Sequence, residues 1–126
     1  MNIYKDVSYK RIYFLDGFWD EYRSLFKKSK NDFEFYVNHL NSNLYFLDNV
    51  ATMNLAIQTP NFEKLSNYSL YSIRHISKLN PRVIFYYHID DIDNPGQIIL
   101  LTAFLEKRKS DYEKAIKKAN SIVKNF

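Results

Sequence analysis

The sequence has no cysteine, and only two glycines and three prolines among its 126 residues. Without cysteine the chain can form neither disulfide bonds nor thiolate metal sites, and nothing points to an oxidising compartment. The scarcity of glycine and proline excludes a low-complexity linker. Hydrophobic residues make up 46% of the chain and aromatic residues 17%, so we expect a folded domain with a sizeable core.

Long apolar runs are also missing. The first residues, MNIYKDVSYKR, lack the apolar segment of a signal peptide. No uncharged apolar run approaches the roughly 20 residues that a membrane span requires. We therefore expect a cytoplasmic protein without a membrane segment, and the length predicts a single domain over residues 1–126.

Positive charge is distributed unevenly along the chain. Residues 1–63 contain seven Lys/Arg and eight Asp/Glu, a balance of −1, whereas residues 64–126 contain eleven and six, a balance of +5. A basic excess in one half suggests a polyanionic partner that binds that half. A solvated charged helix explains the excess of +5 equally well.

The first half of the sequence predicts a strand followed by two helices. Residues 10–15 (KRIYFL) are typical of a strand. Asp16 can cap a helix that runs to about Lys28, and Asn31 with Glu34 resembles a capping arrangement for a second helix. Both helices have apolar residues at helical spacing, which predicts an αα-hairpin. These residues are Phe18, Tyr22, Leu25 and Phe26, then Phe33, Val37, Leu40, Leu44 and Leu47.

Residues 49–61 leave two alternatives open. They either form the end of the second helix or an extended stretch that runs into Pro60. From Leu70 onwards the pattern changes, because LYSIRHIS, RVIFYYHI and QIILLTAF are rich in strand-forming residues. The intervening turns, LNP and DDIDNPG, are short, and this spacing predicts an antiparallel meander.

A final helix is predicted to begin at Ser110. Ser110 and Glu113 form an S-x-x-E capping box, and Asp111 lies at the positive end of the helix dipole. One face of this helix is apolar and the other is basic. The apolar face consists of Tyr112, Ala115, Ile116, Ala119, Ile122, Val123 and Phe126, and the basic face of Lys114, Lys117, Lys118 and Lys124.

Two long strings carry a family resemblance. They are FEKLSNYSLYSIRHISKLNPRVIFYYHI, beginning at Phe62, and IILLTAFLEKRKSDYEKAIKKA, ending at Ala119. In their order and spacing they resemble the core of the RelE/ParE superfamily of toxins from type II toxin–antitoxin systems. The LY-x-IR hairpin followed by R-V-x-Y-x is similar to the HigB-like/RelE-like branch. The first 60 residues match the family only in their order of elements.

The resemblance implies an α+β, RelE-like fold. Residues 1–61 would supply an N-terminal strand and a two-helix hairpin, and residues 62–126 an antiparallel meander and a C-terminal helix. The helices would pack on one face of a small antiparallel sheet, and the other, concave face would be basic.

The resemblance also implies a function. Members of the family cleave mRNA without a metal ion or other cofactor, commonly on the ribosome, and so inhibit translation and arrest growth. We expect the partners to be mRNA, the ribosome and a cognate antitoxin, a small helix-turn-helix DNA-binding protein. Two alternatives remain: a ParE-like inhibitor of DNA gyrase, and a non-catalytic module that binds nucleic acid or protein.

Metal-free RNA cleavage requires a base, a cationic phosphate site and an acid. Arg74 and Arg82 match basic positions of the family, and Arg82 can bind phosphate through two parallel hydrogen bonds. Whether the two share a face depends on the parity of the intervening loop. A cross-strand ion pair is the structural alternative for Arg74, and a solvated turn residue for Arg82.

The remaining candidates come from the last strands and the last helix. Lys107, and after it Arg108, matches basic family residues of which one can act as the general acid. Tyr112 matches a helix-borne tyrosine, although it begins the apolar face of the helix, so core packing is the preferred interpretation. Tyr86 and His88 should share the face of Arg82, and His88 is a candidate acid or base. We expect Lys78, Tyr86 and Lys109 to bind RNA.

One position departs from the RelE-type pattern. Ser72 stands where those members often have a second lysine on the strand that carries Arg74. The departure favours the HigB-like branch and leaves a weakened or inactive enzyme open.

Overall fold

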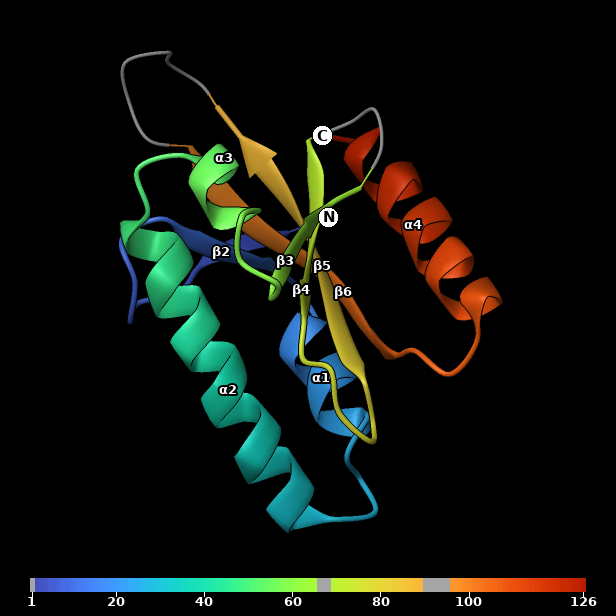
Figure 1. Cartoon of the computed structure of the whole chain (residues 1–126). Coiled ribbons are helices and arrows are strands. Elements are labelled where there is room, and N and C mark those ends of the chain that lie inside the picture. Colours follow the sequence, from blue (N-terminus) through green and yellow to red (C-terminus); the bar gives the residue numbers. More distant parts are fainter. Residues whose placement is uncertain (1, 66–68, 90–95) are drawn as a thin grey trace.

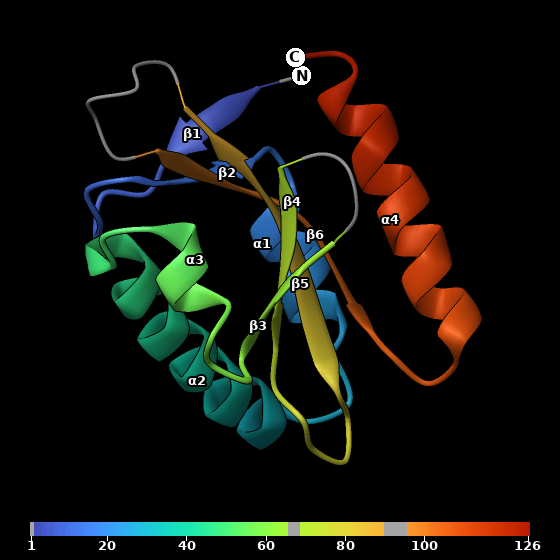
Figure 2. The ribbon, with the colours of Figure 1, turned by 45° about the horizontal axis from the view of Figure 1, so that its top comes forward.

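A computed structural model describes residues 2–65, 69–89 and 96–126 of the chain. The fold has three layers: a six-stranded sheet, three helices on one face of it, and a fourth helix on the other (Figures 1 and 2). The elements in chain order are β1 (Ile3–Lys5), β2 (Ile12–Leu15), α1 (Phe18–Ser24), α2 (Lys30–Asn49), α3 (Met53–Ala56), β3 (Phe62–Lys64), β4 (Leu70–Arg74), β5 (Pro81–His88), β6 (Gln97–Leu105) and α4 (Lys109–Val123).

The strand order in the sheet is β1-β2-β6-β5-β4-β3. The predicted antiparallel meander is confirmed, because β4, β5 and β6 pair antiparallel in sequence, and β3 extends it. The expectation of a wholly antiparallel sheet is wrong, because β2 pairs in parallel with β6. The chain leaves β2 through α1 and α2 before it returns to the sheet, and such a crossover allows parallel pairing. The α+β class holds, with a mixed sheet.

The first core lies between the sheet and α1, α2 and α3. The helical periodicity of the first half is confirmed, because Phe18, Tyr22, Leu40 and Leu44 are among its buried residues. Aromatic rings fill much of this core: Tyr22 stacks on Phe18 with ring centroids 6.3 Å apart. The predicted αα-hairpin therefore packs on the sheet as expected.

The second core lies between the opposite face of the sheet and α4. Ala115, Ala119 and Ile122 of the predicted apolar face are buried there against sheet residues such as Ile84 and Leu101. The resemblance implied helices on one face and an open, basic second face. That expectation is wrong, because α4 covers much of the second face with an apolar contact.

The two helices of the hairpin begin one or two residues away from where the capping patterns placed them. Gly17, not Asp16, is the N-cap of α1, and its φ of 84° is a left-handed conformation that favours glycine. Helix α1 ends at Ser24, short of the predicted boundary. The N-cap of α2 is Ser29, whose side chain accepts a hydrogen bond from the N–H of Asp32, so the predicted cap at Asn31 is wrong.

The start of α4 also differs from the predicted capping box at Ser110. The Asp111 carboxylate accepts hydrogen bonds of 3.0 Å from the backbone N–H groups of Lys107 and Arg108. Those bonds lower the pKa of Asp111, since they favour its charged form. Arg108 is the N-cap, two residues before the predicted cap at Ser110, and the helix begins at Lys109.

Neither alternative for residues 49–61 is correct. Helix α2 ends at Asn49, a separate short helix, α3, follows with Thr52 as its N-cap, and turns lead from it to β3, which begins after the segment at Phe62. Strands β1 and β3 have only three residues each, too few for an alternating pattern to predict them. The predicted turn at 90–96 lies almost wholly outside the described residues.

A buried polar contact joins the C-terminal end of α2 to the chain before β2. The carboxylate of Asp48, which is 6% exposed, accepts hydrogen bonds from the backbone N–H groups of Lys10 and Arg11. The Arg11 guanidinium in turn donates to the carbonyl groups of Leu47, Asp48 and Val50. Arg11 therefore satisfies carbonyl groups that a helix end leaves without partners.

None of the helices in the described part of the chain is both long enough and apolar enough to cross a membrane.

Candidate functional site

The two arginines singled out in the sequence lie side by side on the sheet. Arg74 of β4 is the direct partner of Arg82 of β5 in the antiparallel register. Directly paired residues point to the same face, and Ile84, two residues along β5, belongs to the core beneath α4. Both arginines therefore face the α4 side of the sheet, so the loop between β4 and β5 places them on the same face.

Arg74 forms an ion pair with Glu63 of the edge strand β3. Its Nη1 lies 3.1 Å from Glu63 Oε2, and its Nε donates to the carbonyl of Pro60. The two side chains are 27% and 41% exposed, so the pair is in contact with solvent. The sequence allowed a cross-strand ion pair as an alternative for Arg74, and such a pair is present.

Arg82 forms a more deeply buried ion pair with Glu106. Its Nε lies 2.8 Å from Glu106 Oε2, and the two side chains are 11% and 25% exposed. The backbone N–H of Glu106 donates to the carbonyl of Asn80, which holds the carboxylate beside the start of β5. Arg82 Nε and Nη1 and Glu106 Oε2 are buried without a hydrogen-bond partner among the described residues, so the short contact is an ion pair and not a well-aligned hydrogen bond. The solvated turn position considered for Arg82 is therefore wrong.

Tyr112 of α4 connects the two ion pairs. Its hydroxyl oxygen lies 3.0 Å from Glu63 Oε1 and 2.7 Å from Ser72 Oγ. Its ring lies 5.7 Å from the guanidinium carbon of Arg82, within cation–π range, and packs edge-on against Phe104 at 5.6 Å.

Burial is the main cause that raises the pKa of Tyr112 to about 12. The adjacent Glu63 carboxylate also raises this pKa, whereas the Ser72 hydroxyl and the positive charge of Arg82 lower it. Tyr112 is therefore a protonated hydrogen-bond donor at neutral pH.

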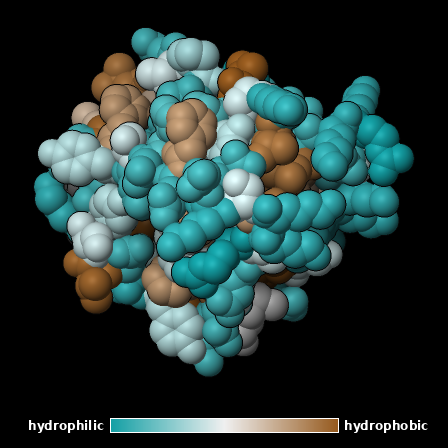
Figure 3. Space-filling model, turned by 90° about the horizontal axis from the view of Figure 1, so that it is seen from below, coloured by the Kyte–Doolittle hydropathy of each residue, from teal (hydrophilic) through white to brown (hydrophobic). Residues whose placement is uncertain are grey.

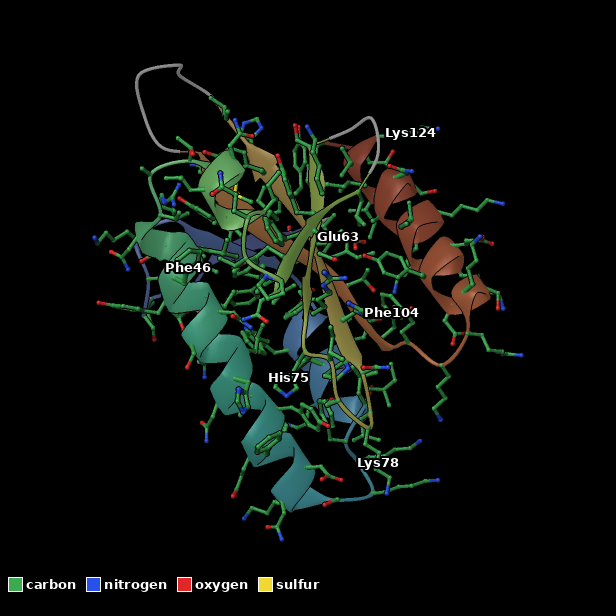
Figure 4. The ribbon with its side chains drawn as sticks, in the orientation of Figure 1. Phe46, Glu63, His75, Lys78, Phe104 and Lys124 are labelled. Carbon is green, nitrogen blue, oxygen red and sulfur yellow. The ribbon has the colours of Figure 1, made fainter. Side chains whose placement is uncertain are left out.

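These contacts define one group of side chains, which we call the Arg–Tyr cluster. It consists of Glu63, Ser72, Arg74, Arg82, Glu106 and Tyr112. Figure 4 labels two residues of this region, Glu63 on β3 and Phe104 on β6, and both lie in the part of the sheet beside α4. The cluster brings cations, carboxylates and a phenol together, and its two arginines and two glutamates balance in charge.

The basic residues expected to complete the site lie at its margin. Lys107, Arg108 and Lys109 are exposed where the chain enters α4. The side chain of this segment that contacts Arg82 is that of the preceding residue, Glu106. The structure therefore places a carboxylate where the sequence suggested a lysine or an arginine.

Tyr86 and His88 share the face of Arg82, as predicted, but lie farther along β5. Tyr86 belongs to the partly buried residues beneath α4, and its ring lies 5.8 Å from that of His88 and 5.7 Å from that of Phe126. Six residues separate His88 from Arg82, on the order of 20 Å along a strand. His88 therefore cannot act on a phosphate held by Arg82.

Lys78 lies at the tip of the β4–β5 loop, at the lower end of the molecule in Figure 4, where it is exposed. The surface at this end is predominantly hydrophilic, with small scattered hydrophobic areas (Figure 3). Lys78 is thus available to a ligand but is not part of the Arg–Tyr cluster.

Sequence reasoning missed both carboxylates of the cluster. Glu63 lies in β3, a strand too short to predict, so nothing in the sequence placed it beside β4. Glu106 stands next to a run of three basic residues, and no local pattern distinguishes it as the partner of Arg82. Ser72 was noted only for the lysine it replaces, yet it is fully buried against Tyr112.

The described residues contain no group of three or more His, Asp or Glu side chains placed to hold a metal ion. Comparisons with protein-family models, with curated protein sequences and with solved structures find no match to this chain. The resemblance of residues 62–119 to the RelE/ParE superfamily therefore remains a prediction.

Proposed function

We propose that this protein is a RelE-like toxin of a type II toxin–antitoxin system, an endoribonuclease that cleaves mRNA on the ribosome without a metal ion. The family resemblance supplies the reaction class. The observation that carries the proposal is the Tyr112 hydroxyl, which lies against the Glu63 carboxylate on the sheet face that holds Arg74 and Arg82.

The reaction assigns a chemical role to each group of the cluster. Glu63 accepts the proton of the ribose 2′-OH while the 2′-oxygen attacks phosphorus. Arg74 and Arg82 stabilise the negative charge of the pentavalent phosphate. Tyr112 donates its proton to the 5′-oxygen as the P–O5′ bond breaks. The products are a 2′,3′-cyclic phosphate and a 5′-hydroxyl.

The two ion pairs differ in how easily a phosphate of the RNA can displace the carboxylate. Arg74 and Glu63 are both partly exposed, so a phosphate can replace Glu63 as the partner of Arg74 and free the carboxylate to act as a base. Arg82 is held more deeply by Glu106. Its guanidinium stabilises the phosphate from a fixed position, since the buried pair is not easily separated.

One observation favours a second candidate, a non-catalytic binding module with this fold. Both arginines are already neutralised by carboxylates, and the cluster bridges α4 to β3, β4 and β5 through ordinary structural contacts. The same geometry therefore serves as a polar connection between helix and sheet.

Expression in bacteria separates these functions. We expect the wild-type chain to arrest growth and to produce new mRNA 5′ ends within codons, mapped by primer extension. Tyr112→Phe removes one hydroxyl without changing the packing of the ring, and it should abolish both effects. Tyr13→Phe, on the same face of the sheet, is the matched control and should leave both intact.

The other outcomes identify the alternatives. Growth arrest with DNA damage and intact mRNA would indicate gyrase inhibition. Absence of arrest with a folded, expressed protein would favour the binding module.

A further inference from the structure

The outer face of α4 concentrates the positive charge of the protein. Residues 107–124 contain seven Lys/Arg and two Asp/Glu, a balance of +5. Because the whole chain carries +4, the rest of the sequence has a balance of −1. The basic excess of the C-terminal half thus belongs to this one helix and the segment that enters it.

Most of these cations have no anionic partner in the part of the chain that the structure describes. Lys118 binds Glu21 at 2.8 Å, and Arg108 lies 3.9 Å from Asp111. The other five are exposed and have no ion pair with any described residue: Lys107, Lys109, Lys114, Lys117 and Lys124. The Asp111 carboxylate accepts hydrogen bonds from two backbone N–H groups, and its negative charge is already included in the balance of +5.

Lys114, Lys117 and Lys124, which pair with no described acidic residue, form a stripe together with Lys118. At about 100° per residue, positions 114, 117, 118 and 124 fall within roughly 120° of arc. Ala115, Ala119 and Ile122 point the opposite way, into the second core. From 114 to 124 the stripe is about 15 Å long at 1.5 Å per residue. Figure 4 shows α4 at the side of the molecule, with Lys124 at one end.

We propose that this stripe binds the phosphate backbone of an RNA strand outside the cleavage cluster. Unpaired lysines in a row release the counterions of a polyanion when they bind it, and they require no particular base sequence. The inference rests on the proposed function for its choice of RNA as the polyanion. Tyr112, in the first turn of the same helix, places the Arg–Tyr cluster next to one end of the stripe.

The test measures binding separately from cleavage. The probe is a fluorescent 2′-O-methyl oligoribonucleotide, which lacks the attacking hydroxyl and cannot be cut. Lys114, Lys117 and Lys124 are changed together to Gln. The control changes Lys27, Lys28 and Lys30 to Gln, which removes the same charge from exposed positions in and after the α1–α2 connection.

Binding is followed by anisotropy over a range of salt concentrations. For single strands the slope of log K against log salt is about −0.7 per phosphate contact, so the α4 variant should flatten the slope by about 2. The control should keep the wild-type slope. Equal flattening in both variants, or no binding by the wild type, would overturn the inference. Binding of polyglutamate through the same lysines, without RNA binding, would overturn it in favour of an acidic protein partner.

Cleavage of unmodified mRNA on ribosomes is measured in parallel. Stripe-dependent binding without any cleavage would refute the proposed nuclease and leave the stripe standing. Cleavage by the wild type with unchanged binding by the α4 variant would refute only the stripe.

Discussion

Arg74 and Arg82 lie directly opposite each other across β4 and β5, yet each is paired with a different carboxylate. Two guanidinium groups on neighbouring strands would repel each other if they stood alone. Glu63 and Glu106 remove that repulsion from opposite sides, one from the edge strand and one from the end of β6. The arrangement keeps two cations together at a site that is neutral until a ligand displaces a carboxylate.

The deeper of these ion pairs should dominate the stability of the cluster. Glu106→Gln leaves the guanidinium of Arg82, 11% exposed, without a counterion. Loss of one partner of a buried pair costs about 3 kcal/mol of unfolding free energy. Urea denaturation measures the change. Glu113→Gln, on the exposed face of α4, should change the free energy by less than about 0.5 kcal/mol. Equal, small effects of both substitutions would show that Arg82 does not need Glu106.

Asp48 should be a second residue on which the stability of the fold depends strongly. Asp48→Ala removes the acceptor for the N–H groups of Lys10 and Arg11 and separates the end of α2 from β2. A buried donor left without a partner costs about 1–3 kcal/mol, so we expect a loss of about 3 kcal/mol in urea denaturation. Asp32→Ala, at an exposed position in the first turn of α2, is the control and should cost well under half as much. A loss no greater than the control's would contradict the assigned role.

His75 should make the fold sensitive to mild acid. Burial, and next the adjacent His39 ring at 4.3 Å, lower its pKa below the usual 6.5. The unfolded chain therefore binds a proton more readily than the folded chain, and the stability contributed by neutral His75 is lost as the pH falls below about 6.5.

Denaturant unfolding of the wild type and of His75→Phe, compared at about pH 7 and about pH 5, isolates this contribution. The wild type should lose more unfolding free energy on acidification than the variant, because the other titrating groups are common to both. An equal loss in the two proteins would show that His75 keeps an ordinary pKa in the fold.

The sequence predicted the parts of the fold that have long periodic patterns. Strands β4 to β6, the helical hairpin and the apolar face of α4 were all visible as alternation or helical spacing, and Arg74, Arg82 and Tyr112 were identified on them. The parallel contact of β2 with β6 was not predictable, since it depends on where the crossover returns the chain.

The cluster itself depends on contacts that local patterns do not encode. Glu63 reaches Tyr112 across 49 residues, from a strand of three residues. Glu106 differs from the adjacent Lys107 by one position, and only the pairing of β5 with β6 determines which of them contacts Arg82. The sequence alone suggested a basic residue beside Arg82, whereas the strand register places Glu106 there and balances the charge of the site.

The most direct test of the proposed function is the cleavage of a defined mRNA on purified ribosomes by the wild type and by Glu63→Gln. The wild type should release a downstream fragment with a 5′-hydroxyl and an upstream fragment ending in a 2′,3′-cyclic phosphate. Loss of a general base should slow this reaction by roughly 10²–10⁴-fold, whereas Glu34→Gln on the exposed surface of α2 should not. Intact mRNA with the folded wild type, or equal cleavage by Glu63→Gln, would contradict the proposed catalytic role of the Arg–Tyr cluster.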